Sequence, residues 1–158
     1  MKYSTFLLMV IIGINSHAQS GKWWKPSKLD YYSMGAMVVS GVAKGYNQAI
    51  IHHHYGRGNQ FWDKTVSWQN KYKDYPTDQS AAYFGSKSIL VFTTDGQHLT
   101  QAIDNTFLVT GTGLSVWDIK QELKEIPKKD RWKYILWRKI LLPFGMRTLA
   151  FELTFKHL

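Results

Sequence analysis

The hydrophobic and polar positions of this chain predict a few helices joined by one long irregular segment. Ser27 and Asp30 have the spacing of a capping box, so a helix is expected to begin near Lys28. This helix is expected to run to about Tyr55, because the glycine-rich residues 56–59 then supply a stop signal. The pattern thus places one long helix ahead of the irregular segment.

Small residues recur inside this first helix. Gly41 and Gly45 have the spacing that lets two helices approach closely. Such close packing would offset the roughly 1 kcal/mol that each interior glycine costs relative to Ala. The apolar run 34–43 is too short to span a bilayer. We therefore expect a buried helix of a soluble bundle and not a membrane span.

Residues 56–84 are expected to form a long connection anchored by aromatic side chains, because neither a helical nor a strand period persists there. A second helix is predicted to follow, capped by Ser86 and ended by the glycines of 110–113. The alternative is a strand over 89–94, since Ile, Val and Thr favour strands. The inward positions of the helix would be Ile89, Phe92, Gly96, Leu99, Ile103 and Phe107.

The end of the chain predicts two further helical elements. A short amphipathic segment is expected over 116–126, and a last helix over 131–157 is expected to be kinked at Pro143. The fold class is therefore predicted to be all-α: a small bundle of three or four helices with a long structured aromatic loop. The alternative is an α+β fold in which the Val66 and Ile89 segments pair as strands.

The first residues predict export. Lys2, the apolar run 6–14 and Ser16-His17-Ala18 have the pattern of a signal peptide that is cleaved after Ala18. Residues 1–18 would then be the leader, and 19–158 would be a single small helical domain. The chain contains no cysteine. We expect an exported protein of the periplasm or the membrane-peripheral envelope that uses no disulfides.

The composition is basic and aromatic, which favours anionic partners. The net charge of the chain is +9, and its seven tryptophans often stand beside Lys or Arg. In an envelope compartment this predicts acidic lipid head groups, lipopolysaccharide or an acidic envelope protein as partners, ahead of nucleic acid. The alternative is that the rings fill a small core while the cations are solvated.

The C-terminal third concentrates this composition. Residues 118–139 hold eight Lys or Arg against four Asp or Glu, together with tryptophans that could enter a membrane surface. The alternative is a solvated amphipathic helix that packs on the domain. The candidate surface-binding residues are Lys128, Lys129, Arg131, Trp132 and Trp137.

A second hypothesis is a metal site. Asp95 and His98 are three residues apart and would share one face of a helix, and His54 lies at the end of the first helix. Two imidazoles and one carboxylate could hold a divalent metal and activate water for hydrolysis. Asn47 would lie on the same face as His54. The alternative is a histidine cluster stabilised by the helix dipole, with Asp95 and His98 as an ordinary polar pair.

The long loop holds another candidate cluster. Asn70, Lys71 and Lys73 stand around the aromatic residues Trp68 and Tyr72. An amide and cations flanked by aromatic rings suit a phosphate, a carboxylate or the face of a sugar. The alternative is that the tryptophans only anchor the loop. Neither a serine-hydrolase elbow nor a glycine-rich phosphate loop occurs in the sequence.

Several motifs over about residues 38–100 resemble a family of small uncharacterised envelope proteins of Bacteroidota. The resemblance implies an envelope location and motifs that act together, but no reaction. It groups Asn47, His54, Asn70, Lys71, Asp95 and His98 as one polar site. The motifs are Ser40-Gly41, Phe61-Trp62-Asp63, Ser67-Trp68-Gln69-Asn70-Lys71-Tyr72-Lys73, Gly85-Ser86 and Thr94-Asp95-Gly96-Gln97-His98-Leu99.

These observations favour a non-enzymatic binding or structural protein that engages an acidic partner or a membrane surface. A metal-binding protein or metal-dependent hydrolase that uses His54, Asp95 and His98 is the alternative. The sequence does not decide whether the chain is an enzyme, and a divalent metal is the one candidate cofactor.

Overall fold

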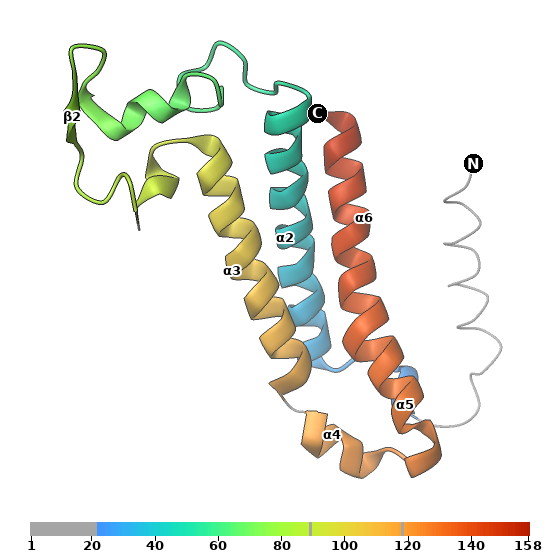
Figure 1. The fold of residues 1–158 in the computed structure, drawn as a ribbon. Coiled ribbons are helices and arrows are strands. Elements are labelled where there is room, and N and C mark those ends of the chain that lie inside the picture. Colours follow the sequence, from blue (N-terminus) through green and yellow to red (C-terminus); the bar gives the residue numbers. More distant parts are fainter. Residues whose placement is uncertain (1–21, 89, 118) are drawn as a thin grey trace.

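Three long helices form the body of the protein. The computed structural model describes residues 22–88, 90–117 and 119–158, and the predicted leader lies outside them. Helix α2 (Lys28–His52) stands between α3 (Gly96–Trp117) and α6 (Leu142–His157). Figure 1 shows α3 antiparallel to α2 and α6 parallel to it. The prediction of a small all-α bundle is confirmed.

The predicted start of α2 is also confirmed. The Ser27 hydroxyl accepts a hydrogen bond from the Asp30 amide (3.3 Å), and the Asp30 carboxylate accepts one from the Ser27 amide (2.8 Å). This reciprocal pair is the capping box. The helix ends at His52, three residues before the predicted end, because His54 takes a positive φ of 53°.

The two predicted close-packing glycines of α2 lie against α6. A Cβ atom on Gly41 would stand 2.2 Å from the Arg147 carbonyl oxygen, and one on Gly45 would stand 2.7 Å from Thr154 Cβ. Any side chain at these positions would therefore push α6 away from α2.

Helix α3 differs from the prediction at both ends. It begins at Gly96 and not near Ser86, because the described residues of 85–95 (85–88 and 90–95) form turns and a short 3₁₀ helix (Val91–Thr93). It continues through the glycines of 110–113 to Trp117, since Gly111 packs against Met37 of α2 and does not terminate the helix.

The predicted inward face of α3 was only partly right, because Gly96 is buried but the predicted apolar residues of this helix are not. Phe107 is exposed, Leu99 and Ile103 are half-buried, and Ile89 lies outside the described residues. The buried positions are small or polar instead. They are Gly96, Thr100, Asp104, Gly111 and Ser115. Thr100, Asp104 and Gly111 contact or bond to α2, whereas Gly96 packs against Trp62 and Ser115 donates to the Lys139 carbonyl oxygen.

The long connection between α2 and α3 contains more regular structure than predicted. A 3₁₀ helix (Ser67–Lys71) leads into an antiparallel hairpin of β1 (Tyr72–Asp74) and β2 (Asp78–Ala82). Tyr72 pairs with Ala82 and Asp74 with Asp78, with an irregularity between the two pairs. The alternative α+β pairing of the Val66 and Ile89 segments does not occur among the described residues.

The C-terminal part turns back along the bundle. Short helices α4 (Ile119–Glu125) and α5 (Arg131–Tyr134) lead through a π-helical segment (Ile135–Leu141) into α6. The irregularity predicted at Pro143 therefore begins before it, and Pro143 occupies the first turn of α6, where no amide donor is needed. No helix in the described part of the chain is long and apolar enough to cross a membrane.

Candidate functional site

Asp95 and His98 form a helix cap at the start of α3. The Asp95 carboxylate accepts hydrogen bonds from the His98 amide (2.8 Å) and lies 2.7 Å from His98 Nδ1. The carboxylate is buried, whereas the imidazole is partly exposed. The predicted pairing is therefore present, and its geometry is that of an N-cap that also orients a histidine ring.

Asn47 joins the first helix to this cap region. Its Nδ2 donates to the Gln97 carbonyl oxygen (2.8 Å) and to Thr100 Oγ1 (3.1 Å). The end of α2 and the start of α3 thus lie together, as expected for antiparallel neighbours. The amide of Asn47 is used for this contact, so its role here is to hold the two helices in register.

His54 is not part of that arrangement. It is exposed just beyond the end of α2, where its neighbour His53 stacks on Phe155 of α6 with ring centroids 4.4 Å apart. Over residues 22–88, 90–117 and 119–158, no group of three or more His, Cys, Asp or Glu side chains could hold a metal ion. The structure therefore does not bring His54, Asp95 and His98 together as metal ligands.

Asn70 and Lys71 hold the long loop in place. Asn70 Nδ2 donates to the carbonyl oxygens of Gln60 (3.1 Å) and Thr94 (2.8 Å). The Lys71 carbonyl oxygen accepts from Ser86 Oγ (2.9 Å) and from the Tyr83 amide (3.0 Å). The Asn70 side chain and the Lys71 backbone thus tie the loop to the segment before α3.

Asp63, which belongs to the Phe61-Trp62-Asp63 motif but was not among the candidate site residues, is a loop anchor. Its carboxylate accepts hydrogen bonds from the Gly58 amide (2.9 Å) and from the Thr65 hydroxyl (2.7 Å) and amide (2.9 Å). These donors stabilise the charged form and lower the pKa of Asp63 to about 2.

This pKa predicts an acid-sensitive loop. A carboxylate whose pKa is lowered by folding stabilises the protein above its unfolded pKa, and that contribution is lost as the pH falls toward the folded pKa. The stability difference between the wild type and Asp63→Asn should therefore be full at pH 5 and shrink between about pH 4 and about pH 2. Urea unfolding across that range measures it, and a difference that stays constant would contradict the assignment.

A buried ion cluster joins the start of α2 to the C-terminal segment. Asp30 accepts hydrogen bonds from Arg138 Nε (2.7 Å) and Lys139 Nζ (2.7 Å), and Glu122 of α4 lies 2.7 Å from both cations. Tyr134 donates to Glu122, and Arg138 and Lys139 lie over the Tyr134 ring. Two carboxylates thus neutralise two cations inside the protein.

The pKa directions agree with that charge pattern. Burial raises the pKa of Asp30, but hydrogen bonds from Lys139, the Ser27 amide and Arg138 outweigh burial and hold it below its usual value. The pKa of Glu122 is also lowered, because Lys139, Tyr134 and Arg138 outweigh its burial. Burial and the neighbouring Glu122 carboxylate raise the pKa of Tyr134 well above its ordinary value. Both carboxylates therefore remain charged near neutral pH.

A second polar layer lies further along the bundle. Ser40 Oγ donates to Asp104 Oδ1 (2.6 Å), and Arg147 of α6 donates to both Ser40 (2.8 Å) and Asp104 (2.9 Å). No buried side-chain nitrogen or oxygen of the described residues lacks a partner. The core between these helices is consequently rich in polar contacts.

The opposite end of the bundle from the loop is cationic and aromatic. Figure 1 places α4, α5 and the start of α2 there. The exposed side chains of this end include three tryptophans and four lysines that make no ion pair with the described residues. We call this set the cationic aromatic end: Trp24, Trp117, Trp132, Lys120, Lys124, Lys128 and Lys129.

The predicted surface-binding residues divide into two groups. Lys128, Lys129 and Trp132 are exposed. Arg131 and Trp137 are half-buried, and Arg131 Nε donates to the Ile126 carbonyl oxygen (3.3 Å). Of the eight cations in 118–139, Arg138 and Lys139 are buried and paired in the ion cluster, so they do not contribute to the surface. The cationic surface is therefore smaller than the sequence indicated.

Comparison of the chain with protein-family models, with curated proteins and with solved structures found no match.

Proposed function

We propose that this chain is an exported envelope protein that binds anionic membrane surfaces peripherally through its cationic aromatic end. The observation that carries the proposal is the arrangement of exposed apolar and cationic side chains in the C-terminal third. Trp132 is 61% exposed and Trp117 is 79% exposed, beside the exposed Lys128 and Lys129. Tryptophan favours the boundary between water and lipid, and lysine favours anionic head groups.

Apolar exposure continues from this end along the C-terminal helix. Six large aliphatic or aromatic side chains between 136 and 153 are between 42% and 53% exposed, although α6 packs on α2. Large exposed apolar patches mark interaction sites, and we take this row of side chains as part of the binding surface. We call these six the apolar flank: Leu136, Ile140, Leu141, Phe144, Leu149 and Leu153.

The charge around the apolar flank supports lipid as the occupant. Among the described residues of 119–133, Glu125 is the one exposed carboxylate, because Glu122 and Asp130 lie in ion pairs with Lys139 and Lys133. Along the apolar flank itself, Glu152 pairs with Lys156 (3.3 Å). Lys133 also lies 6.0 Å from the Trp23 ring and 5.9 Å from the Trp132 ring, which joins both tryptophans to the same basic surface. Phosphate-bearing head groups of phospholipid or lipopolysaccharide match this combination of positive charge and exposed rings.

Co-sedimentation with vesicles tests the proposal. The mature chain should pellet with vesicles that contain phosphatidylglycerol but much less with pure phosphatidylcholine. Each lysine near an anionic surface contributes about 1 kcal/mol, so replacing Lys128 and Lys129 by Ala should weaken partitioning about 30-fold. Raising the salt from about 0.1 M to about 1 M shortens the Debye length from about 10 Å to about 3 Å and should also weaken binding.

The exposed pair Lys73 and Lys87, at the other end of the molecule, provides the matched control. Replacing both by Ala removes the same charge and should leave vesicle binding close to that of the wild type. Equal losses in the two double variants would show that only net charge matters and would contradict a defined binding end. Absence of wild-type binding to anionic vesicles, with capture of an acidic protein instead, would also overturn the lipid proposal.

A further inference from the structure

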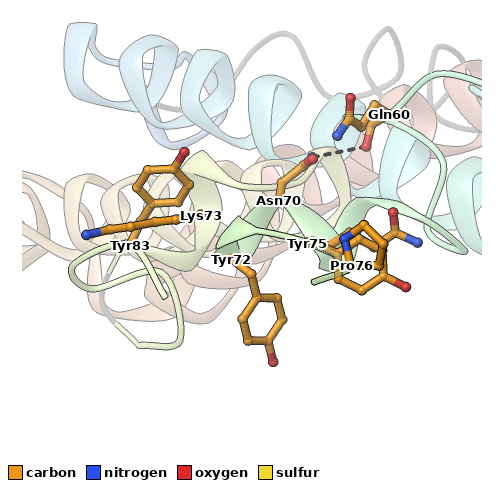
Figure 2. Close-up of a pocket in the computed structure, with 8 residues that line it drawn as sticks. Gln60, Asn70, Tyr72, Lys73, Tyr75, Pro76 and Tyr83 are labelled. Atoms are coloured by element: carbon orange, nitrogen blue, oxygen red, sulfur yellow. Dashed lines mark hydrogen bonds between the residues drawn. The ribbon is translucent and has the colours of Figure 1, made fainter. Parts of the chain in front are cut away.

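A polar and aromatic pocket lies in the loop between α2 and α3, away from the cationic aromatic end. Its volume is about 520 Å³, within the range of about 300–1,000 Å³ that is usual for small-ligand sites. Figure 2 shows Lys73 and Tyr83 toward one end of this pocket and Tyr75 with Pro76 toward the other. Neither the membrane proposal nor the helix packing uses these side chains.

The aromatic walls of the pocket are held in position. The Trp68 ring contacts Tyr72 and Tyr75 edge-on, with centroid distances of 6.3 Å and 5.1 Å. Trp68 is itself fixed, because its Nε1 donates to the Thr65 carbonyl oxygen (3.0 Å). Tyrosine faces that are fixed before a ligand arrives lose little conformational entropy on binding.

The floor of the pocket is tied to the rest of the protein by Asn70. Its two hydrogen bonds, to the Gln60 and Thr94 carbonyl oxygens, link the loop to the segment before α3. The Gln60–Asn70 bond is drawn in Figure 2. The Asn70 side chain therefore fixes the pocket to the main chain at two points.

The polar groups of the pocket define the chemistry of its ligand. The amides of Gln60 and Gln69 offer both donors and acceptors, which suits the hydroxyl groups of a sugar. Lys73 is exposed, and no carboxylate in the described part of the chain pairs with it. A phosphate site would be expected to offer several cations or an arginine fork. Lys73 is the cation among the lining residues, and Lys87 lies over the Tyr72 ring, 4.7 Å from its centroid.

We propose that this pocket binds an oligosaccharide that carries carboxylate groups, with sugar rings against the tyrosines and one carboxylate at Lys73. The aromatic faces, the amides and the single cation then each meet a matching part of one ligand. Figure 1 places this loop at the opposite end of the bundle from α4 and α5, so a membrane-bound molecule would hold the pocket away from the lipid.

Titration calorimetry with a hexamer of galacturonic acid tests this proposal at physiological salt. The wild-type chain should bind the acidic hexamer, and Lys73→Ala should weaken binding about tenfold or more, because a charge-assisted hydrogen bond is lost. Tyr83→Ala should also weaken it. The methyl-esterified hexamer has the same rings without the charge and should bind about as weakly to the wild type as the acid does to Lys73→Ala.

Three outcomes would overturn the proposal. The first is no binding of the acidic hexamer to the wild type, and the second is unchanged binding to Lys73→Ala. The third is equally tight binding of polyglutamate, which would reduce the interaction to charge alone. The Lys128→Ala/Lys129→Ala variant should bind the hexamer as the wild type does, so failure of the pocket and failure of the membrane proposal give different results.

Discussion

Replacing Asp30 by Leu is expected to lower the free energy of unfolding by about 3–5 kcal/mol. Asp30 is 2% exposed and accepts hydrogen bonds from both Arg138 and Lys139, which are each 5% exposed. Without it, two buried cations share the single carboxylate of Glu122. Breaking one side of a buried ion cluster leaves an uncompensated charge, which costs far more than loss of a surface pair. Urea denaturation measures the change.

Two control variants separate the loss of the ion cluster from the loss of the capping box and from the loss of an exposed carboxylate. Asp30 also belongs to the capping box. Ser27→Ala should remove the hydroxyl's bonds with the Asp30 amide and carboxylate, leave both cations paired with Asp30, and cost about 1 kcal/mol. Asp74→Asn alters an exposed carboxylate of the loop and should be nearly neutral. If Asp30→Leu were no more destabilising than Ser27→Ala, the ion cluster would contribute nothing beyond the cap.

Introducing a single methyl group at Gly41 is expected to destabilise the bundle by about 3 kcal/mol. The added Cβ would lie 2.2 Å from the Arg147 carbonyl oxygen and 3.1 Å from its carbonyl carbon. Backbone atoms cannot rotate away as a side chain does, so α6 must move off α2. That movement would also strain the hydrogen bonds from Arg147 to Ser40 and Asp104.

Gly35→Ala is the matched control for Gly41→Ala. Both glycines lie inside α2, but nothing stands within 4 Å of a Cβ atom at position 35. Gly35→Ala should therefore raise stability by up to about 1 kcal/mol, because alanine is the better helix former. Thermal unfolding of both variants measures these changes. Shifts of the melting temperature in the same direction would contradict the close approach of α2 and α6.

The start and packing of α2 could be predicted because local chemistry determines them. The capping box needs only Ser27 and Asp30, and the spacing of Gly41 and Gly45 already indicates a close helix contact. The extent of α3 could not be predicted in this way. Gly111 is a residue that commonly ends helices, but here it packs against Met37 of α2, and the sequence does not reveal this tertiary contact.

The polar residues that lie buried between α2 and α3 were not predicted, because apolar periodicity was taken as the signal of the core. Asp104 and Thr100 occupy the buried face of α3, where they bond to Ser40 and Asn47 of α2. A carboxylate on a helix gives no sequence signal of its distant partner. The repeated polar positions at 100 and 104 of α3 were the one available hint, because they recur at a four-residue spacing.

The candidate site was partly predictable. The sequence predicted that Asp95 pairs with His98 and that Asn47 lies near the same end of the bundle. The structure has Asp95 against the His98 ring, and Asn47 donates to the Gln97 carbonyl oxygen. His54 was grouped with them by helical spacing, but the chain leaves the helix before that residue. Asn70 and Lys73 of the pocket were among the residues that the sequence singled out. Tyr75 and Tyr83 were not, because the hairpin brings them to the pocket.

In the proposed peripheral binding mode, the C-terminal third contacts lipid while the loop between α2 and α3 remains in water. Because the chain has no cysteine, a single one can be introduced at an exposed position and labelled with an environment-sensitive fluorophore. Leu136→Cys places the label on the apolar flank, and Thr77→Cys places it on the hairpin loop. On addition of anionic vesicles, we expect a blue-shifted and brighter emission at 136 with no change at 77. No change at 136, or an equal change at 77, would contradict it.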